Sequence, residues 1–338
     1  MDDKTAVMVC GHGSRDAEAI AEFDALAARL RELLPDCDVG SGYLEFARPI
    51  IREGLERLKD RGARRILAVP GMLFAAGHVK NDLPWELNSF AAENPDIAVH
   101  YGRDLAIDPK LLRASRDRIE AAERAAPDGI QRDETLLMVV GRGTNDPDAN
   151  ANISKVARML WEGMGFGWAE ASFSGVAQPR VNTGLRRAVR LGFRRIIVFP
   201  YFLFTGILVK RIYRQSDEVA QEYPEIQFLK AAYLKDHPLV LEVFQDRIGE
   251  ISTGDNRMNC QLCKYREQMI GYEGEVGAPQ VGHHLHVRGI GTGADTGADT
   301  GHGHGHHPHD HHHGDGQGSG GGGRAEPGEP GADTAGDG

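Results

Sequence analysis

Long apolar runs are missing from this sequence, and so are a basic charge excess and a rich set of cysteines. No stretch of about 18 apolar residues occurs, so a transmembrane helix is not expected. The first residues lack a basic segment followed by an apolar one, so we expect no secretory signal peptide. Lys and Arg number 39 against 49 Asp and Glu, and the net charge of −10 argues against nucleic-acid binding. The four cysteines, two isolated and two in one CxxC, are too few for a secreted disulfide framework, so a cytoplasmic protein is expected.

Residues 289–338 consist almost entirely of Gly, His, Asp, Ala and Thr. Such a segment cannot bury an apolar core, so we expect a disordered tail. Clustered imidazoles on a flexible chain bind Co, Ni, Zn or Cu with little geometric selection. Because the segment lacks the uniform hexahistidine run of a purification tag, we interpret it as a natural tail that raises the local metal concentration. Its candidate metal ligands are His302, His304, His306, His307, His309, His311, His312 and His313.

The chain contains an internal duplication. The motif GHGSRD at residues 11–16 aligns with GRGTND at residues 141–146, 130 positions later. The same offset of 130 pairs RRILAVP at residues 64–70 with RRIIVFP at residues 194–200. One constant offset without a gap over roughly seventy residues indicates two homologous halves.

Each half alternates short apolar segments with segments of helical periodicity. The first half predicts strands near residues 6–10, 40–46, 65–69 and 97–101, and helices near residues 17–34, 48–61, 79–93 and 109–122. Pro49 is expected in the first turn of its helix, and Ser14 or Asp16 is expected to cap the first helix. The second half predicts strands near residues 135–140, 169–174, 195–199 and 226–231. This alternation predicts an α/β fold with a doubly wound parallel sheet in each half.

Four parts of the chain are expected. Residues 1–128 and 133–252 form two tandem homologous domains, residues 253–288 form a segment that holds the CxxC, and residues 289–338 form the tail. In doubly wound sheets, ligands bind beyond the carboxyl ends of the strands. The loops around residues 11–16, 45–49 and 71–78 should therefore form the site.

Three residues at those strand ends carry the candidate chemistry: His12, Glu45 and His78. Two imidazoles and a carboxylate suit a divalent first-row metal held with open coordination positions. Neutral histidine and carboxylate can also accept protons near neutral pH. Insertion of a metal into a macrocycle needs both properties, because two pyrrole N–H protons must leave.

The second half serves as an internal comparison for these three residues. At the offset of 130, His12 becomes Arg142, Glu45 becomes Gly175 and His78 becomes Leu208. The candidate ligands are lost together while the surrounding residues stay, which indicates one chemically active half and one that only walls the cleft.

Four basic residues are candidate partners for carboxylates of an acidic substrate, namely Arg15, Lys80, Arg142 and Lys210, although each could equally be plain surface charge. A phosphate-binding loop at residues 11–13 is the weaker interpretation, because GxGxxG and GxxxxGK[ST] are both missing there.

With these residues in view, the sequence resembles the class II chelatases, and among them the long form of the sirohydrochlorin cobaltochelatases. The matching segments include VMVCGHGSRD, GYLEFARP around Glu45 and VPGMLFAAGHVKNDLP around His78, and the resemblance spans roughly residues 4–270. It implies a bilobal fold, a sirohydrochlorin-type tetrapyrrole as substrate and insertion of Co²⁺ for cobalamin biosynthesis. It also implies that His12, Glu45 and His78 bind the metal or act in insertion. Related ferrochelatases and nickel chelatases share most of these motifs, so iron or nickel remains an alternative.

The CxxC at Cys260 and Cys263 offers two thiolates to one soft metal or cluster. By itself it is a weak signal, because a zinc or iron–sulfur site usually needs four ligands, and a free or oxidised thiol pair is the alternative. The resemblance adds weight, since long-form cobaltochelatases carry such a motif associated with a [4Fe–4S] cluster. Cys10 and Cys37 are expected to be buried or incidental.

Two classes of function therefore remain open. The first is a chelatase that needs no nucleotide, and the second is a metal storage or delivery protein in which the histidine tail does the binding. A storage protein has no need of His12, Glu45 and His78 around a cleft. The duplication suggests that a monomer is sufficient, whereas a shared cluster would favour a homodimer.

Overall fold

The computed structural model describes residues 4–127, 129–258 and 262–278. Cys260 and the tail histidines lie outside these residues, so the predictions about them are not tested by the structure. None of the helices in the described residues is long and apolar enough to cross a membrane.

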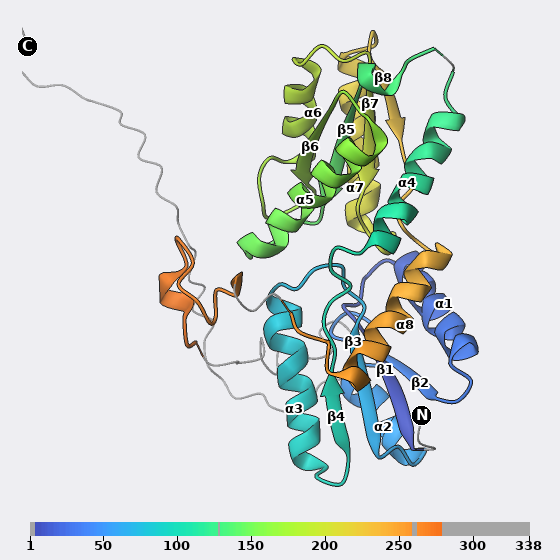
Figure 1. The fold of residues 1–338 in the computed structure, drawn as a ribbon, viewed down its shortest axis with the longest axis vertical. Coiled ribbons are helices and arrows are strands. Elements are labelled where there is room, and N and C mark those ends of the chain that lie inside the picture. The colour runs from blue at the N-terminus through green and yellow to red at the C-terminus, as the bar shows by residue number, and fades with distance from the viewer. Residues whose placement is uncertain (1–3, 128, 259–261, 279–338) are drawn as a thin grey trace, which may run out of the picture. The chain divides into compact units, whose positions relative to one another are not determined.

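The first half folds as an open parallel sheet with helices on both faces (Figure 1). Its strand order is β2-β1-β3-β4, and every neighbouring pair is parallel. The two central strands, β1 and β3, are buried because crossover helices cover both faces of the sheet, as in other doubly wound sheets. In chain order the elements are β1 (Thr5–Gly11), α1 (Ala17–Leu33), β2 (Asp38–Tyr43), α2 (Ile51–Asp60), β3 (Arg65–Pro70), the π-helical turn η1 (His78–Asp82), α3 (Leu83–Glu93), β4 (Ala98–Tyr101) and α4 (Pro109–Arg124).

The second half repeats this arrangement with strand order β6-β5-β7-β8. Strands β5 and β7 start 130 positions after β1 and β3, which confirms the duplication and the predicted fold class. The elements are η2 (Arg132–Glu134), β5 (Thr135–Gly141), α5 (Pro147–Met164), β6 (Trp168–Phe173), α6 (Val181–Val189), β7 (Arg195–Pro200), α7 (Ile207–Glu222), β8 (Gln227–Lys230) and α8 (Pro238–Thr253); a short turn, η4 (Glu273–Glu275), follows.

Two local predictions about helix starts have different outcomes. Asp16 caps α1 by accepting a hydrogen bond from the backbone N–H of Glu18, as predicted. The placement of Pro49 in the first turn of a helix is wrong, because α2 begins only at Ile51 and the Arg48–Pro49 peptide bond is cis. Ile50 is still extended there, since it bridges to Tyr43 beside β2.

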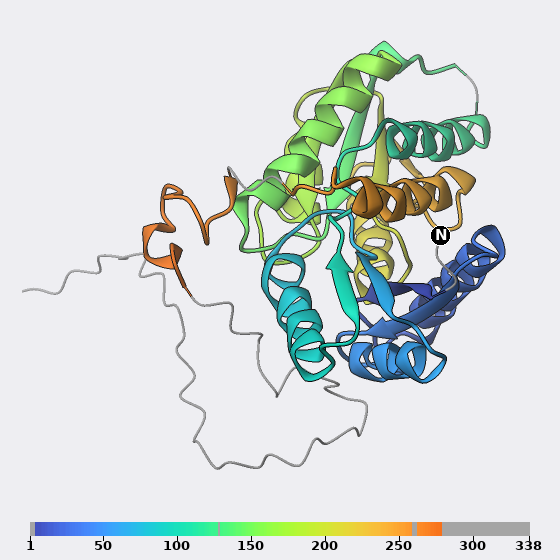
Figure 2. The same cartoon turned by 60° about the horizontal axis from the view of Figure 1, so that its bottom comes forward.

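The last helix of each half packs on the other half. Helix α8 lies against α1 and β3 of the first half, and α4 lies against α5 and β8 of the second (Figures 1 and 2). Phe244 of α8 approaches the backbone at Gly71, and Ile251 fits directly over Gly102. The largest buried cluster therefore draws side chains from both halves, so the two sheets share one core.

Candidate functional site

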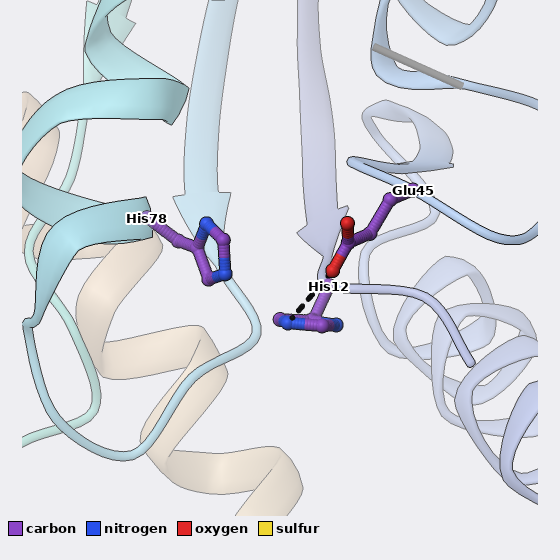
Figure 3. A group of neighbouring side chains, drawn as sticks. All are labelled: His12, Glu45 and His78. Carbon is purple, nitrogen blue, oxygen red and sulfur yellow. Dashed lines mark ion pairs between the residues drawn. The ribbon is translucent and has the colours of Figure 1, made fainter. Parts of the chain in front are cut away.

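The three candidate metal ligands meet at the carboxyl ends of adjacent strands. His12 follows β1, Glu45 follows β2, and His78 begins the π-turn η1 that comes after β3. Because these strands are parallel and neighbours in the sheet, their carboxyl ends share one edge. Figure 3 shows the three side chains converging from three separate segments.

The distances within the trio suit one metal ion. One ligand atom from each of His12, Glu45 and His78 can be chosen so that all lie within 4.8 Å of one another. The Nε2 atom of His12 is 3.2 Å from Oε1 of Glu45, and the His12 and His78 ring centroids are 4.7 Å apart. Within the described residues this is the only such group of three or more His, Cys, Asp or Glu side chains. The nitrogen and oxygen donors match those that divalent first-row metals accept.

Burial keeps the site ready to bind a cation. Removal from water lowers the pKa of His12 to about 3, with the charges of Arg142 and His78 as further causes, so its imidazole is neutral. Nδ1 of His12 lies 2.9 Å from the carbonyl oxygen of Gly13, which can only accept a hydrogen bond. With the proton on Nδ1, the lone pair of Nε2 accepts a hydrogen bond from Nη2 of Arg142 at 3.2 Å and is available to a metal ion. Burial also raises the pKa of Glu45 above its ordinary value, which makes this carboxylate a better proton acceptor.

Gly13 makes the contact between the His12 and Glu45 loops possible. Its φ is +95°, and a Cβ on this residue would lie 1.6 Å from the carbonyl oxygen of Glu45. Across this close approach the backbone N–H of Glu45 donates to the carbonyl of His12 at 3.0 Å. The glycine that resembled part of a phosphate-binding loop thus allows two candidate metal ligands to lie side by side.

His12 and His78 line a cavity of about 490 Å³ to which both halves contribute. Its walls are mainly apolar, with aromatic side chains such as Phe46, Phe74 and Phe202. Arg15 and Arg142 also line it, and the Arg15 guanidinium lies 4.6 Å from the centre of the Phe46 ring. An apolar pocket with a few charged groups at one side suits a flat ring with acidic substituents.

Comparison with known proteins identifies the family. The CbiX family matches residues 6–122 and again residues 136–251, one match for each half. The chain belongs to the CbiX family of class II chelatases.

Relatives of this CbiX chain differ in the metal that their names give. The sirohydrochlorin cobaltochelatase of Priestia megaterium is 31% identical over 77% of this chain and 84% of that protein. The sirohydrochlorin ferrochelatase of the same organism is 28% identical over 73% of this chain and 91% of that protein. A structure of SirB from Bacillus subtilis with Fe³⁺ has a TM-score of 0.65 and 26% identity, covering 76% of this chain and 100% of that chain.

Arg142 takes the place that His12 would have in the second half of the CbiX chain. Its Nη2 atom is 3.2 Å from Nε2 of His12, so the substituted residue reaches across to the metal ligand itself. Burial lowers the pKa of Arg142, and the Glu45 carboxylate opposes that shift. Of the four predicted substrate-binding residues, Arg142 and Arg15 are the two that line the cavity.

Lys80 and Lys210 are placed differently from the predicted role in substrate binding. The Lys80 ammonium is buried and lies 2.7 Å from Asp146 and 3.5 Å from Asp148 of the second half. Lys210 is the equivalent of Lys80 in the second half, and its ammonium lies 2.8 Å from Asp16 of the first half. Neither lysine lines the cavity, because each forms an ion pair with the aspartate that caps a helix of the other half.

Asp82 is a site residue that the sequence reasoning missed. Its Oδ2 atom is 2.7 Å from Nδ1 of His78, and its side chain is buried. The signal was present as an acidic residue four positions after a candidate ligand, which is within reach along a helix.

The cysteines do not form a complete cluster site within the described residues. The Cys263 thiol is buried, whereas Cys10 and Cys37, buried as expected, belong to the core clusters of the folded body. Cys263 does not belong to any group of three metal-binding side chains within the described part of the chain. A [4Fe–4S] cluster usually needs four ligands, and Cys263 is the single cysteine of the CxxC within the described residues.

Proposed function

We propose that this chain is a sirohydrochlorin chelatase that inserts Co²⁺ into its tetrapyrrole and releases two protons. Membership of the CbiX family supports the reaction, and the cobaltochelatase relative, matched over most of its length, supports the metal. The observation that carries the proposal is the convergence of His12, Glu45 and His78, of which the two histidines line an apolar cavity.

The site accounts for both requirements of the reaction. The two imidazoles and the carboxylate present the metal with open coordination positions, into which the pyrrole nitrogens of the ring can enter. As the metal–nitrogen bonds form, the two N–H protons pass to basic groups of the site and then to water. Neutral His12 and the Glu45 carboxylate lie 3.2 Å apart, and both groups can accept the pyrrole protons.

Arg142 and Arg15 are proposed to bind carboxylates on the rim of the ring. Both guanidinium groups line the cavity, and Arg pairs with carboxylates through two parallel hydrogen bonds. Arg142, which now lies 3.2 Å from Nε2 of His12, would then turn from a neutral acceptor to an anionic one.

The parts of the chain outside the described residues have proposed roles that follow from the sequence alone. The histidines between His302 and His313 collect divalent metal near the cleft. Cys260 and Cys263 contribute to a [4Fe–4S] cluster, which a homodimer would complete, while a monomer suffices for the cleft itself. A cytoplasmic location agrees with reduced thiols.

An anaerobic absorbance assay tests the proposal. Purified protein is mixed with sirohydrochlorin and Co²⁺, Fe²⁺ or Ni²⁺ in parallel, and the spectral change is compared with the rate without protein. We expect the largest acceleration with Co²⁺ and its loss in His12→Ala. Faster insertion of Fe²⁺ would instead assign the ferrochelatase activity, in line with the second relative. No acceleration with any metal would favour the storage or delivery function.

A further inference from the structure

The π-turn at His78–Asp82 is confined to the half of the chain that carries the metal ligands. Leu83 donates its backbone N–H to the carbonyl of His78, five residues back, which is the hydrogen bond of a π-helix. This is the only π-helical segment among the described residues. The equivalent residues 208–212 of the second half lie in the regular α-helix α7. π-turns are rare and occur mostly at functional sites.

The side chains on this turn differ between the halves in the same way. His78 and Asp82 form a hydrogen-bonded pair of 2.7 Å in the first half. In the second half Leu208 takes the place of the histidine, and residues 210–212, Lys-Arg-Ile, include no carboxylate. The ligand and its buried carboxylate partner are therefore kept together or lost together. A carboxylate that served only the fold would have no reason to disappear with the histidine.

Contacts from other elements hold the turn in place. The Tyr101 hydroxyl on β4 donates to the carbonyl of Val79 at 2.9 Å, and Lys230 takes the place of this tyrosine on β8. Lys80 ties the same turn to Asp146 of the second half. The position of Asp82 behind His78 is thus fixed by the fold rather than by the two side chains alone.

The hydrogen bond between Nδ1 of His78 and Oδ2 of Asp82 determines which nitrogen of His78 can bind a metal. An ionised carboxylate only accepts hydrogen bonds, so Nδ1 of His78 must carry the proton and Nε2 must carry the lone pair. The carbonyl of Gly13 makes the same selection for His12. Both rings then present the same nitrogen, and their centroids are 4.7 Å apart with an angle of 80° between their planes.

We propose that Asp82 is a positioning residue that selects the Nε2 lone-pair tautomer of His78 and aims it at the metal shared with His12 and Glu45. This inference rests on the proposed function, because it takes the trio as the place that receives the metal. Carboxylate partners of metal-binding histidines act in this way elsewhere, and their removal typically lowers metal affinity or activity about 10–100-fold.

The test uses the full chain and compares Asp82→Asn with Glu86→Gln. Asn has the size of Asp but carries no charge, so it no longer enforces one tautomer of the neighbouring ring. Glu86 is a second buried carboxyl group one turn further along, in α3, and it provides the matched control. For Asp82→Asn we expect kcat/KM for Co²⁺ to fall about 10–100-fold, with KM for sirohydrochlorin and the unfolding temperature unchanged. Glu86→Gln should behave like the wild type.

A double-mutant cycle shows whether Asp82 acts through His78. The variant His78→Ala/Asp82→Asn should be no worse than His78→Ala, because the carboxylate then has no ring to orient. Additive losses, a wild-type response of Asp82→Asn, or equal increases in both KM values would overturn the inference. If Asp82→Asn lowers the unfolding temperature, Asp82→Glu becomes the second variant. Asp82→Glu should bind Co²⁺ more tightly than Asp82→Asn if the acceptor matters, and no more tightly if only packing matters.

Titration with Co²⁺ alone separates this inference from the proposed function. The histidine tail is common to all variants, so differences between their visible absorption spectra report the folded site. If the wild type binds Co²⁺ through His78 but inserts none, the proposed function fails, and Asp82→Asn still tests the inference by its dissociation constant. If His78→Ala binds Co²⁺ like the wild type, both the proposed function and the inference about Asp82 are wrong.

Discussion

At the residue scale, the substitution of a few side chains separates the half that carries His12, Glu45 and His78 from the half that lacks them. His12 and Arg142 occupy equivalent positions, and their side chains meet at 3.2 Å across the cleft. The first supplies a neutral lone pair, and the second supplies a charge that does not bind metal. Under the proposed function, this one exchange would give the cleft a side that binds metal and a side that binds an anion.

The substitution Arg142→Met tests whether Arg142 binds a carboxylate of the substrate. The methionine keeps an apolar side chain in the cavity wall but removes the guanidinium that would pair with a substrate carboxylate. We expect KM for sirohydrochlorin to rise about tenfold, which is the scale of one charged hydrogen bond. Binding of Co²⁺ in the absence of sirohydrochlorin should be equal or tighter, since a positive charge beside His12 has gone. A KM equal to that of the wild type in steady-state kinetics would remove Arg142 from the substrate site.

Asp104 links the stability of the chain to pH. Burial raises its pKa from 3.8 to about 6, and the carboxylate accepts a hydrogen bond from the backbone N–H of Ala75 at 2.9 Å. Since the unfolded chain titrates near 3.8, the folded chain holds this proton more tightly between the two values. The contribution of Asp104 to the free energy of unfolding is therefore fully present below pH 4 and is lost as the pH rises to about 6, a change of roughly 3 kcal/mol.

Asp104→Asn should remove that dependence while still accepting the hydrogen bond from Ala75. Urea unfolding of both proteins at pH 4, 5, 6 and 7 is the measurement. The free energy of unfolding of the variant, minus that of the wild type, should increase across the series by about 2.4 kcal/mol. A difference that does not change with pH would show that Asp104 titrates near its ordinary value in the folded chain.

At the scale of single elements, the starts of α1 and α5 connect the two halves. Asp16 and Asp146 cap these helices, and each also binds the lysine of the opposite half, Lys210 and Lys80 respectively. The two ion pairs are related by the same offset of 130, but their surroundings differ. The Lys80 side chain is 6% exposed, whereas that of Lys210 is 52% exposed.

This difference in exposure predicts different costs for the same substitution. Lys80→Met would leave Asp146 and Asp148 buried without their cation, and we expect the free energy of unfolding to fall by about 3–5 kcal/mol. Lys210→Met is the matched control and should change stability little, because water screens and replaces the exposed pair. Chemical denaturation of both variants checks the order. Equal decreases in the free energy of unfolding would mean that burial of the Lys80 ion pair does not affect stability.

At the scale of the whole molecule, the exchange of α4 and α8 makes the halves depend on one another. Phe244 of α8 is fully buried, with Gly71 of the first half among its neighbours. Arg247 of the same helix donates to the backbone carbonyl of Leu105 at 2.7 Å, so polar as well as apolar contacts cross between the halves. The cleft is therefore built from two lobes that share one core.

Phe244→Ala is expected to destabilise the entire folded body rather than the second half alone. Loss of a buried phenylalanine costs about 3–5 kcal/mol, and the cavity would open against the first half. Calorimetry should show one transition, shifted to lower temperature. Gln245→Ala, at the next position of α8, is the control and should unfold close to the wild type. Two separate transitions would show that the lobes unfold independently.

The sequence by itself determined the duplication, the order of strands and helices, the fold class and the three candidate ligands. These follow from local patterns, since apolar strands, Gly-rich loops and a constant offset of 130 are visible without three dimensions. The comparison between His12 and Arg142 even indicated which half would be active. The start of α2 was misplaced because the bridge between Tyr43 and Ile50 joins residues that only the folded chain brings together.

Only the tertiary structure decided which charged residues face the cavity and which are already paired. Lys80, Lys210, Arg15 and Arg142 look alike in sequence, yet two are bound to helix-capping aspartates and two line the site. The role of Asp82 and the exchange of α4 and α8 likewise depend on distances between distant segments. Hydrophobic periodicity fixes the face of an element, but the partner of a charge depends on long-range packing that no local pattern records.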